Sequence, residues 1–392
     1  MKLLPKKGIL IAFGELFLKS PGVKRIFKRR LIQSLSFFLK KEGLDFKIFS
    51  FRERVFIETS KIKKSLKITK KIFGIAWLAD CLFFPKITLR KFSNFVGKNY
   101  KDWIKKDETF AIRLKRDPHY QISGVGVKES REKIIDEIAK MIDRKVNLSK
   151  PKREIFIEVR KRGWFLYFKK IKGKGGLPIG SEGKVLSLIS GGIDSPAAAF
   201  LIAKRGAKNI WLHFHSFPLV SKASIEKVKE LAKIFLNYQP HLKIYFIPFQ
   251  KAQMEIKATI LPKYRILFYR RLMFKMAEKI AQKKECQALV TGESLGQVSS
   301  QTLPNIRIIE TGIKIPVLRP LIGMDKEEII NLAKKIRTFQ ISIKPQEDCC
   351  TLFVPKHATA KGDPETIKKL EKKLNIKNII QETIKEAQIE KY

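Results

Sequence analysis

The sequence predicts a multidomain protein with α+β units in its N-terminal half and an α/β domain, built on a parallel sheet, in its C-terminal half. Three observations support this prediction. The chain has 392 residues, which is more than one hydrophobic core usually serves. Residues 1–170 mix alternating strand patterns with a few helical ones, whereas strand and helix patterns alternate regularly after residue 183. A short glycine-rich segment separates the two halves.

Residues 1–60 form the first predicted unit. Residues 8–18 have the pattern of a strand followed by a turn, residues 23–40 that of a basic amphipathic helix, and residues 46–59 that of a strand pair. This order predicts a small α+β domain.

Residues 61–170 form a second, strongly basic α+β unit. Residues 109–116 alternate apolar with basic side chains, residues 129–147 form a predicted helix, and residues 154–168 form a predicted hairpin. No aromatic signature for base stacking is present, so a basic face of this kind favours recognition of a folded RNA by its shape. The alternative is a charged face that is only solvated.

Residues 171–182 contain four glycines and one proline. Such a density of chain-breaking residues predicts a linker with no regular element.

The C-terminal domain is predicted over residues 183–360, and a Lys/Glu-rich helical tail over residues 361–392. Its regular alternation predicts right-handed crossovers and a ligand site at the carboxyl ends of the strands. The predicted strands are 185–189, 209–214, 243–248 and 287–291, and the predicted helices are 195–204, 222–236, 262–284 and 325–338.

The first of these strands runs into a turn that suits an anionic ligand. The turn reads Ser190-Gly191-Gly192-Ile193-Asp194-Ser195-Pro196 and opens an alanine-rich helix. Glycines let the backbone approach phosphate oxygens, and the free N–H groups and dipole of a helix N-terminus attract negative charge. Asp194 and Ser195 are placed to hold a metal or a phosphate. The alternative is a plain strand-to-helix turn; the kinase and GTPase P-loop is excluded because its motif does not occur.

Further polar residues are predicted at the same sheet edge. His213 and Phe214 end the second strand, Arg270 lies on the long helix, and residues 291–302 follow the fourth strand with glycines and polar side chains. Packing is the alternative role for the histidine, and solvation at the surface is the alternative for Arg270.

Cys349 and Cys350 are adjacent. Neighbouring Cα atoms lie about 3.8 Å apart, below the roughly 4.4–6.8 Å usual for disulfides, so at least one of these thiols is expected to be free. The alternative is a pair of buried structural cysteines.

Composition restricts the partners and the compartment. Lys and Arg number 82 against 37 Asp and Glu, a net charge of +45, which favours a polyanionic partner such as nucleic acid. The start of the chain lacks an apolar leader and no apolar run is long enough to span a membrane, so we expect a cytoplasmic protein. The histidines and cysteines lack zinc-like spacing, so no structural metal is predicted.

Several strings distributed along the chain resemble those of the tRNA uridine 4-sulfurtransferases, or 4-thiouridine synthetases. The basic unit at 61–170 resembles a THUMP domain, and the turn at 190–196 resembles the pyrophosphatase loop of ATP pyrophosphatases, an adenine nucleotide alpha hydrolase-like domain. The remaining strings are Gly14–Ser20, Gly175–Gly180, Gly292–Gln297 and Asp348–Cys350.

This resemblance implies a ferredoxin-like domain at 1–60, a THUMP domain at 61–170, a linker, and a pyrophosphatase domain at 183–360, in the family form that has no rhodanese domain. It also implies adenylation of the C4 oxygen of uridine 8 in tRNA, with ATP and Mg²⁺, followed by attack of persulfide sulfur and release of AMP. A cysteine desulfurase, or another persulfide donor, would supply the sulfur. The family also feeds sulfur to thiamine synthesis.

The resemblance assigns site residues as well. Cys349 is the first choice for the thiol that handles sulfur, and Cys350 the second, while Asp194 is the catalytic carboxylate. Leu188, Ile189, His213, Phe214, Arg270, Gly292 and Gln301 would contact ATP, and Ser190, Gly191, Gly192, Asp194 and Ser195 would surround pyrophosphate.

Departures from the family pattern occur at Gln346, at Lys174 and at residues 217–221, and they bear on detail more than on function. A homodimer in which one subunit holds tRNA for the other would suit separate RNA-binding and catalytic domains. Two rival functions stay open: a small-molecule ATP pyrophosphatase of the amidating type, and a non-catalytic RNA-binding protein.

Overall fold

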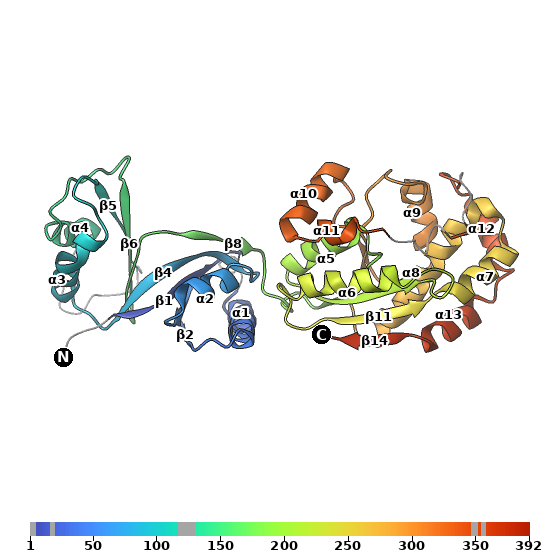
Figure 1. Cartoon of the computed structure of the whole chain (residues 1–392), viewed down its shortest axis with the longest axis horizontal. Helices are drawn as coiled ribbons and strands as arrows, with labels where there is room; N and C mark the ends of the chain where they lie inside the picture. Colours follow the sequence, from blue (N-terminus) through green and yellow to red (C-terminus); the bar gives the residue numbers. More distant parts are fainter. Residues whose placement is uncertain (1–4, 16–19, 117–129, 346–351, 354–357) are drawn as a thin grey trace. The chain divides into compact units, whose positions relative to one another are not determined.

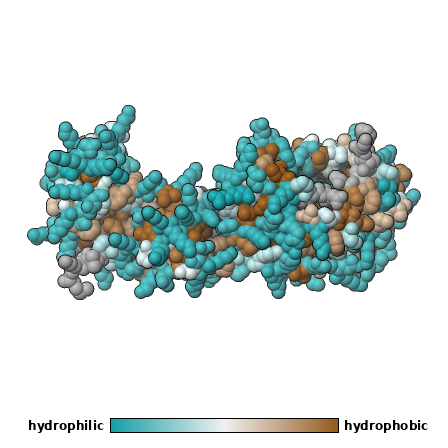
Figure 2. Space-filling model, viewed as in Figure 1, coloured by the Kyte–Doolittle hydropathy of each residue, from teal (hydrophilic) through white to brown (hydrophobic). Residues whose placement is uncertain are grey.

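The computed structural model describes residues 5–15, 20–116, 130–345, 352–353 and 358–392 (Figure 1). The chain divides into two compact units, Met1–Gly176 and Leu177–Tyr392. Hydrophilic residues cover most of the visible surface of each unit, and smaller apolar areas lie among these hydrophilic residues (Figure 2). In the described part of the chain, no helix has both the length and the apolar character needed to cross a membrane.

The C-terminal unit contains a six-stranded sheet in the order β13-β12-β9-β10-β11-β14. All pairings are parallel except that of β14, which runs antiparallel to β11, so the predicted parallel sheet is confirmed. The strands are β9 (Lys184–Leu188), β10 (Lys208–His215), β11 (Lys243–Pro248), β12 (Ala288–Val290), β13 (Val317–Leu318) and β14 (Gln388–Lys391).

Helices cover both faces of this sheet. The helices are α5 (Asp194–Lys204), α6 (Ala223–Phe235), α7 (Gln250–Thr259), α8 (Arg265–Lys283), α9 (Leu303–Glu310), α10 (Lys326–Ile336), α11 (Phe339–Ser342), α12 (Pro364–Glu371) and α13 (Ile376–Lys385). The four strands and four helices predicted after residue 183 are all present, with ends that differ by a few residues. Helices α7, α9 and α11 and strand β13 were not predicted.

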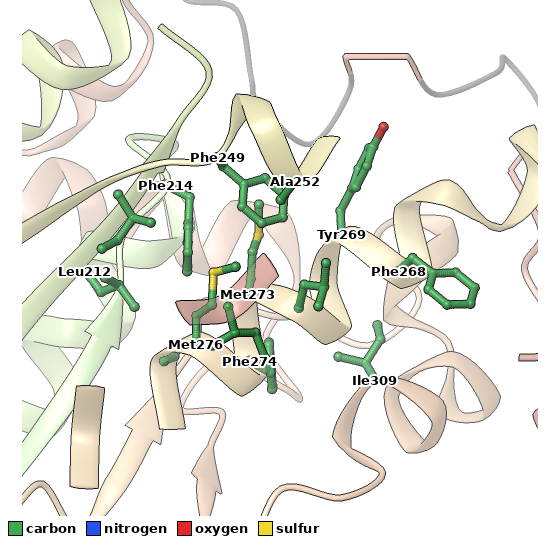
Figure 3. Packing of buried hydrophobic residues seen from close by; sticks show 14 of the residues in the cluster. Leu212, Phe214, Phe249, Ala252, Phe268, Tyr269, Met273, Phe274, Met276 and Ile309 are labelled. Carbon is green, nitrogen blue, oxygen red and sulfur yellow. The ribbon is translucent and has the colours of Figure 1, made fainter. Parts of the chain in front are cut away.

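Successive residues of β9 point to opposite faces and pack into different cores, as a strand between two helical layers requires. Val185 joins the cluster under α5 and α10, whereas Leu186 joins the larger cluster around α8. Figure 3 shows this larger cluster, in which Phe214, Phe249 and Met273 pack together. The buried residues that surround α8 fix the helix that carries Arg270.

The last thirty or so residues belong to this unit. Residues 361–392 were expected to form a helical tail, but they form α12, α13 and an edge strand, and the strand was not predicted. Apolar residues of these helices, such as Ile367 and Ile380, are buried in the cluster around α8. Glu371 on α12 also pairs with Arg271 and Lys275 on α8. One of the charged residues of the predicted tail, Glu371, therefore helps to attach it to α8.

The expectation that residues 171–182 contain no regular element is wrong. Residues 171–175 form β8, which pairs antiparallel with β4 (Ile75–Pro85). A Cβ on Gly173 would lie 2.2 Å from the carbonyl oxygen of Ile75, so glycine here permits close pairing beside an irregular register. Beyond it, the N–H of Leu177 donates to the Lys204 carbonyl over 2.9 Å.

The N-terminal unit is built on one eight-stranded sheet, ordered β2-β3-β1-β4-β7-β6-β5, with β8 also on β4. Strand β4 pairs with β1 on one side and with β7 on the other, so the two predicted N-terminal units share a single sheet. The other elements are β1 (Lys6–Phe13), β2 (Lys47–Ser50), β3 (Arg54–Glu58), β5 (Phe110–Arg116), β6 (Arg153–Arg160), β7 (Gly163–Tyr167), α1 (Pro21–Lys41), α2 (Ile62–Thr69), α3 (Leu89–Asn99) and α4 (Arg131–Ala139).

The four helices pack on one face of this sheet. The alternation predicted along residues 109–116 is confirmed, because Phe110, Ile112 and Leu114 all lie in the core beneath α3 and α4. A second core forms between α1 and strands β1 and β3, where Leu31 packs with other apolar residues.

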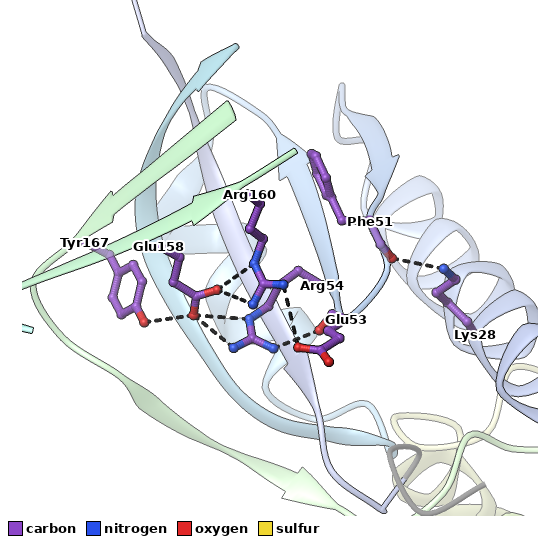
Figure 4. A network of polar contacts seen from close by, with 7 residues as sticks. All are labelled: Lys28, Phe51, Glu53, Arg54, Glu158, Arg160 and Tyr167. Carbon is purple, nitrogen blue, oxygen red and sulfur yellow. Dashed lines mark hydrogen bonds and ion pairs between the residues drawn. The ribbon is translucent and has the colours of Figure 1, made fainter. Parts of the chain in front are cut away.

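The other face of the sheet encloses a buried ion network (Figure 4). Glu158 on β6 is 2% exposed and accepts hydrogen bonds from Arg54 on β3 at 2.9 Å, Arg160 at 2.6 Å and Tyr167 at 3.2 Å. Strands β3 and β6 are four positions apart, which is about 19 Å in a flat sheet. A direct contact between them therefore requires the sheet to curl around this face.

Burial tends to raise the pKa of Glu158, but the charges of Arg54 and Arg160 outweigh it and hold the pKa below its ordinary value. The carboxylate therefore stays ionised inside the curl. Aromatic rings fill the rest of this space, as the stacked pair Phe83 and Phe165 shows with ring centroids 4.7 Å apart.

We predict that Glu158→Gln destabilises the N-terminal unit by about 3–5 kcal/mol, because two buried guanidinium groups lose the buried carboxylate that they share, and Arg160 keeps only its longer pair with the exposed Glu53 at 3.6 Å. Urea unfolding followed by tryptophan fluorescence would measure the change. Tyr167→Phe is the matched control, since it removes only a neutral donor and should cost about 1 kcal/mol. Equal effects of the two substitutions would contradict a charge-based role.

Candidate active site

The turn between β9 and α5 is closed by its own hydroxyl groups. The N–H of Ser190 donates to Ser195 Oγ over 3.0 Å, and the two serine Oγ atoms lie 3.2 Å apart. Gly191 has a φ of +90°, a conformation that favours glycine. Helix α5 has no side-chain cap at its N-terminus, so its first N–H groups and the positive end of its dipole are available to an anion.

Asp194 is the first residue of α5 and is contacted by two side chains, neither of which was assigned a role from the sequence. Lys326 Nζ lies 2.9 Å from Asp194 Oδ1, and Gln297 Nε2 donates to Oδ2 over 3.0 Å. Gln297 falls within the predicted 291–302 string. Lys326 follows the capping residue Asp325 of α10, and this local signature indicates only a helix start.

Gly292 brings the segment after β12 against the same turn. A Cβ at this position would lie 2.6 Å from the backbone nitrogen of Ser195 and 2.7 Å from the carbonyl carbon of Asp194. Only glycine allows this approach. The structure thereby brings together the turn and the 291–302 string, two of the predicted parts of the site.

Arg270 reaches this segment from α8. Its Nη2 group pairs with Glu293, which is 2% exposed and directly follows Gly292. Glu293 also binds Arg319, just beyond β13. Arg270 was expected near this edge, and Glu293 lies within the predicted 291–302 string. Arg319 and the pairing itself were not predicted, because an ion pair between distant residues leaves no local pattern.

His213 on β10 is buried, with 2% of its surface exposed, and it connects β10 to the turn. Its Nδ1 lies 2.8 Å from the Ile189 carbonyl oxygen, and its Nε2 lies 3.2 Å from Ser224 Oγ on α6. Burial lowers the pKa of His213 to about 4, and the Ile189 carbonyl only partly opposes this effect. The imidazole is therefore neutral at neutral pH.

The predicted ATP contacts do not all face one side of the sheet. Phe214 neighbours His213 on the same strand, so its ring points to the opposite face and packs 5.4 Å from the ring of Phe249. Gln301 is buried and accepts a hydrogen bond from the N–H of Ser294 over 3.4 Å. Leu188 is half-buried at the end of β9.

Cys349 and Cys350 lie outside the described residues, but the chain that leads to them is attached at the turn. Ser342 Oγ, at the end of α11, donates to the Gly192 carbonyl over 3.2 Å. The buried Lys227 on α6 donates to the Ser342 carbonyl over 3.2 Å. Cys349 is seven positions after Ser342 in the sequence, so the two Cα atoms can lie at most about 25 Å apart.

Comparison with known proteins gives a consistent result over the whole chain. Residues 180–376 match the family described as Thiamine biosynthesis protein (ThiI), residues 8–79 match the ThiI ferredoxin-like domain, and residues 99–169 match the THUMP domain. A probable tRNA sulfurtransferase of Alkaliphilus metalliredigens is 34% identical, covering 98% of this chain and 97% of that protein. Another from Thermoanaerobacter sp. is 37% identical, covering 95% and 96%.

A solved structure is similar over the same extent. A 4-thiouridine synthetase in complex with RNA and with bound ATP has a TM-score of 0.86 and 30% sequence identity. The likeness covers 98% of this chain and 99% of the other.

We predict that Gly292→Ala weakens nucleotide binding and destabilises the protein by about 1–3 kcal/mol, because the added methyl group would displace the start of α5. Thermal unfolding and ATP titration would measure the two effects. Gly323→Ala is a matched control, since a Cβ there would meet nothing within 4 Å. Unchanged ATP affinity in Gly292→Ala would show that the close approach does not shape the site.

We predict that the free energy of unfolding falls as pH drops from about 6.5 to about 4, because the unfolded state then binds a proton that buried His213 does not. Across this window the loss from His213 is about 3 kcal/mol. Urea unfolding at several pH values would measure it, and His213→Gln should give a shallower dependence. Parallel pH profiles for the two proteins would contradict the assignment.

Proposed function

The chain belongs to the ThiI family of tRNA sulfurtransferases, and we propose that it uses ATP to replace the C4 oxygen of uridine 8 in tRNA with sulfur. The observation that carries the proposal is the uncapped turn at the start of α5, with Asp194 held beside it by Gln297 and Lys326. A net charge of +45 supports a polyanionic substrate.

The first step is activation of a poor leaving group. The uridine C4 oxygen attacks the α-phosphorus of ATP, the bond from that phosphorus to the bridging oxygen breaks, and pyrophosphate leaves. N–H groups of the turn and the dipole of α5 stabilise the negative charge that develops there. Pyrophosphate is proposed to lie against Ser190, Gly191, Gly192 and Ser195. The proposed contacts to the rest of ATP are Leu188, Ile189, His213, Phe214, Arg270, Gly292 and Gln301.

Asp194 is the residue proposed to hold Mg²⁺. Magnesium in nucleotide sites is usually bound by one or two carboxylates together with phosphate oxygens, and a single carboxylate at the turn fits that pattern. Among the described residues, no group of three or more potential metal ligands occurs. When bound, the ion would neutralise phosphate charge; Asp194 itself would exchange its contacts with Lys326 and Gln297 for that role.

The second step is transfer of sulfur. We assign the sulfur-carrying thiol to Cys349, with Cys350 as second choice, because the chain before them is attached to the turn at Gly192. The terminal sulfur of a Cys349 persulfide attacks C4, and AMP leaves with the original C4 oxygen. A thiol of a separate dithiol reductant then attacks Cys349 Sγ, which breaks the S–S bond and releases 4-thiouridine, and the second thiol of the reductant restores the Cys349 thiol. A cysteine desulfurase, or another persulfide donor, supplies the sulfur. We also propose that the protein forms a homodimer and that it supplies sulfur for thiamine synthesis.

We predict that Asp194→Ala abolishes both AMP formation and 4-thiouridine formation with unmodified tRNA, because pyrophosphate departure loses its charge compensation.

We predict that Cys349→Ser keeps 4-thiouridine formation with free sulfide but loses it when a cysteine desulfurase is the donor. AMP release and thiouridine absorbance would be read together.

Cys286→Ser is the control for the thiol, since Cys286 is buried, far along the chain from the pair, and has a pKa raised to about 11 by burial. It should retain activity with both donors. Formation of AMP without tRNA would favour a small-molecule substrate, and failure to bind ATP would favour a non-catalytic RNA-binding protein.

A further inference from the structure

Glu293 is a buried carboxylate whose two oxygens serve different partners. Oε1 pairs with Nη2 of Arg270 on α8, whereas Oε2 accepts from Arg319 Nε at 2.5 Å and from Thr291 Oγ1 at 2.9 Å. Arg319 in turn pairs with Glu310 on α9. Three separate segments of the C-terminal unit therefore meet at this one carboxylate, and Arg319 connects them to α9.

The network is almost closed to solvent. The side chain of Glu293 is 2% exposed, that of Arg319 is 11% exposed and that of Arg270 is 17% exposed. Burial tends to raise the pKa of Glu293, but the charges of Arg270 and Arg319 outweigh it, so the pKa lies below its ordinary value and the carboxylate is ionised. Burying such a group costs free energy that apolar packing would not, so stability alone is a poor reason for its presence.

The arrangement leaves part of the hydrogen-bonding capacity of the Arg270 guanidinium group unused. Arg270 shares only one oxygen of Glu293, because Arg319 and Thr291 occupy the other. Within the described part of the chain, the buried Nε of Arg270 has no hydrogen-bond partner. A guanidinium that is held by one N–H group, on a carboxylate that it shares with a second arginine, keeps both a fixed position and the ability to bind an anion.

The position of Glu293 is itself fixed relative to the turn. It directly follows Gly292, whose Cα lies against the first residues of α5. Arg270 is therefore attached, through one carboxylate, to the segment that contacts the proposed pyrophosphate site. Without Arg319, Oε2 of Glu293 would keep only the hydrogen bond from Thr291. Arg270 could then bind both carboxylate oxygens side-on, which would neutralise its charge and turn it away.

We infer that Glu293 and Arg319 are positioning residues for ATP: they hold the Arg270 guanidinium in place and keep its charge available to the polyphosphate. The inference rests on the proposed function, because it takes Arg270 as a ligand of ATP. Arg319 acts through Glu293 and need not touch the nucleotide.

The experiment uses the full-length protein with ATP titration, ATP KM, the kcat for 4-thiouridine at saturating ATP, and thermal unfolding. The main variant combines Arg319→Met with Glu310→Gln, which removes one cation and one anion and so keeps the net charge. Arg319→Lys tests rescue by a cation that can donate to Glu293. Lys275→Met is the structural control, because it breaks an ion pair on α8 that does not involve Glu293.

We expect the double variant to raise the ATP Kd and KM by about tenfold or more, with kcat within about threefold, because a displaced ligand weakens binding. Arg319→Lys should return the ATP Kd to within about threefold of wild type. Lys275→Met should lower thermal stability and leave the ATP Kd unchanged.

An ATP Kd within about twofold of wild type in the double variant, with only the unfolding temperature lowered, would overturn the inference in favour of a structural role. Unchanged ATP affinity in Arg270→Met would overturn it too, because Arg270 would then not be a ligand. Failure of the proposed function looks different: wild-type protein would bind ATP yet form no 4-thiouridine, and the ATP Kd series would still decide the roles of Glu293 and Arg319.

Discussion

The close approach of Gly292 to the start of α5 is the constraint on which the rest of the candidate site depends. A Cβ at residue 292 would lie 2.6 Å from the Ser195 nitrogen, so the strand end and the helix start can meet only at a glycine. Because they meet, Gln297 can donate to Asp194, and Glu293 can form ion pairs with Arg270 and Arg319. A larger residue would separate the turn from both sets of contacts at once.

The N-terminal unit depends on a different constraint. One sheet runs through both parts of this unit, and it curls so that Arg54 and Arg160 share the buried Glu158. The ferredoxin-like and THUMP regions are therefore joined by hydrogen bonds through β4 in one sheet, and they are not two domains connected only by a linker. An RNA-binding surface on one part would have its shape set partly by the other.

Much of the fold was predictable because its signals are local. The alternation at Phe110, Ile112 and Leu114 and the strand and helix repeats after residue 183 are confirmed, since each follows from period 2 or 3.6 in the sequence. Strand β8 was missed because its glycines indicate a loop when read alone; only the approach of Ile75 explains Gly173. Strand β14 was missed because its four residues include Glu and Lys and gain their pairing only from β11.

The glycine-bearing turn, the alternating elements and the charge of the chain could be read from the sequence, because backbone freedom, periodicity and composition are properties of neighbouring residues. Which side chains meet at the turn depends on the tertiary structure. Gln297 and Lys326 are 103 and 132 residues from Asp194, and Glu293 meets Arg270 and Arg319 across three elements. Such partners are chosen by how crossovers and cores pack, and a charged residue looks the same in sequence whether it is solvated or paired.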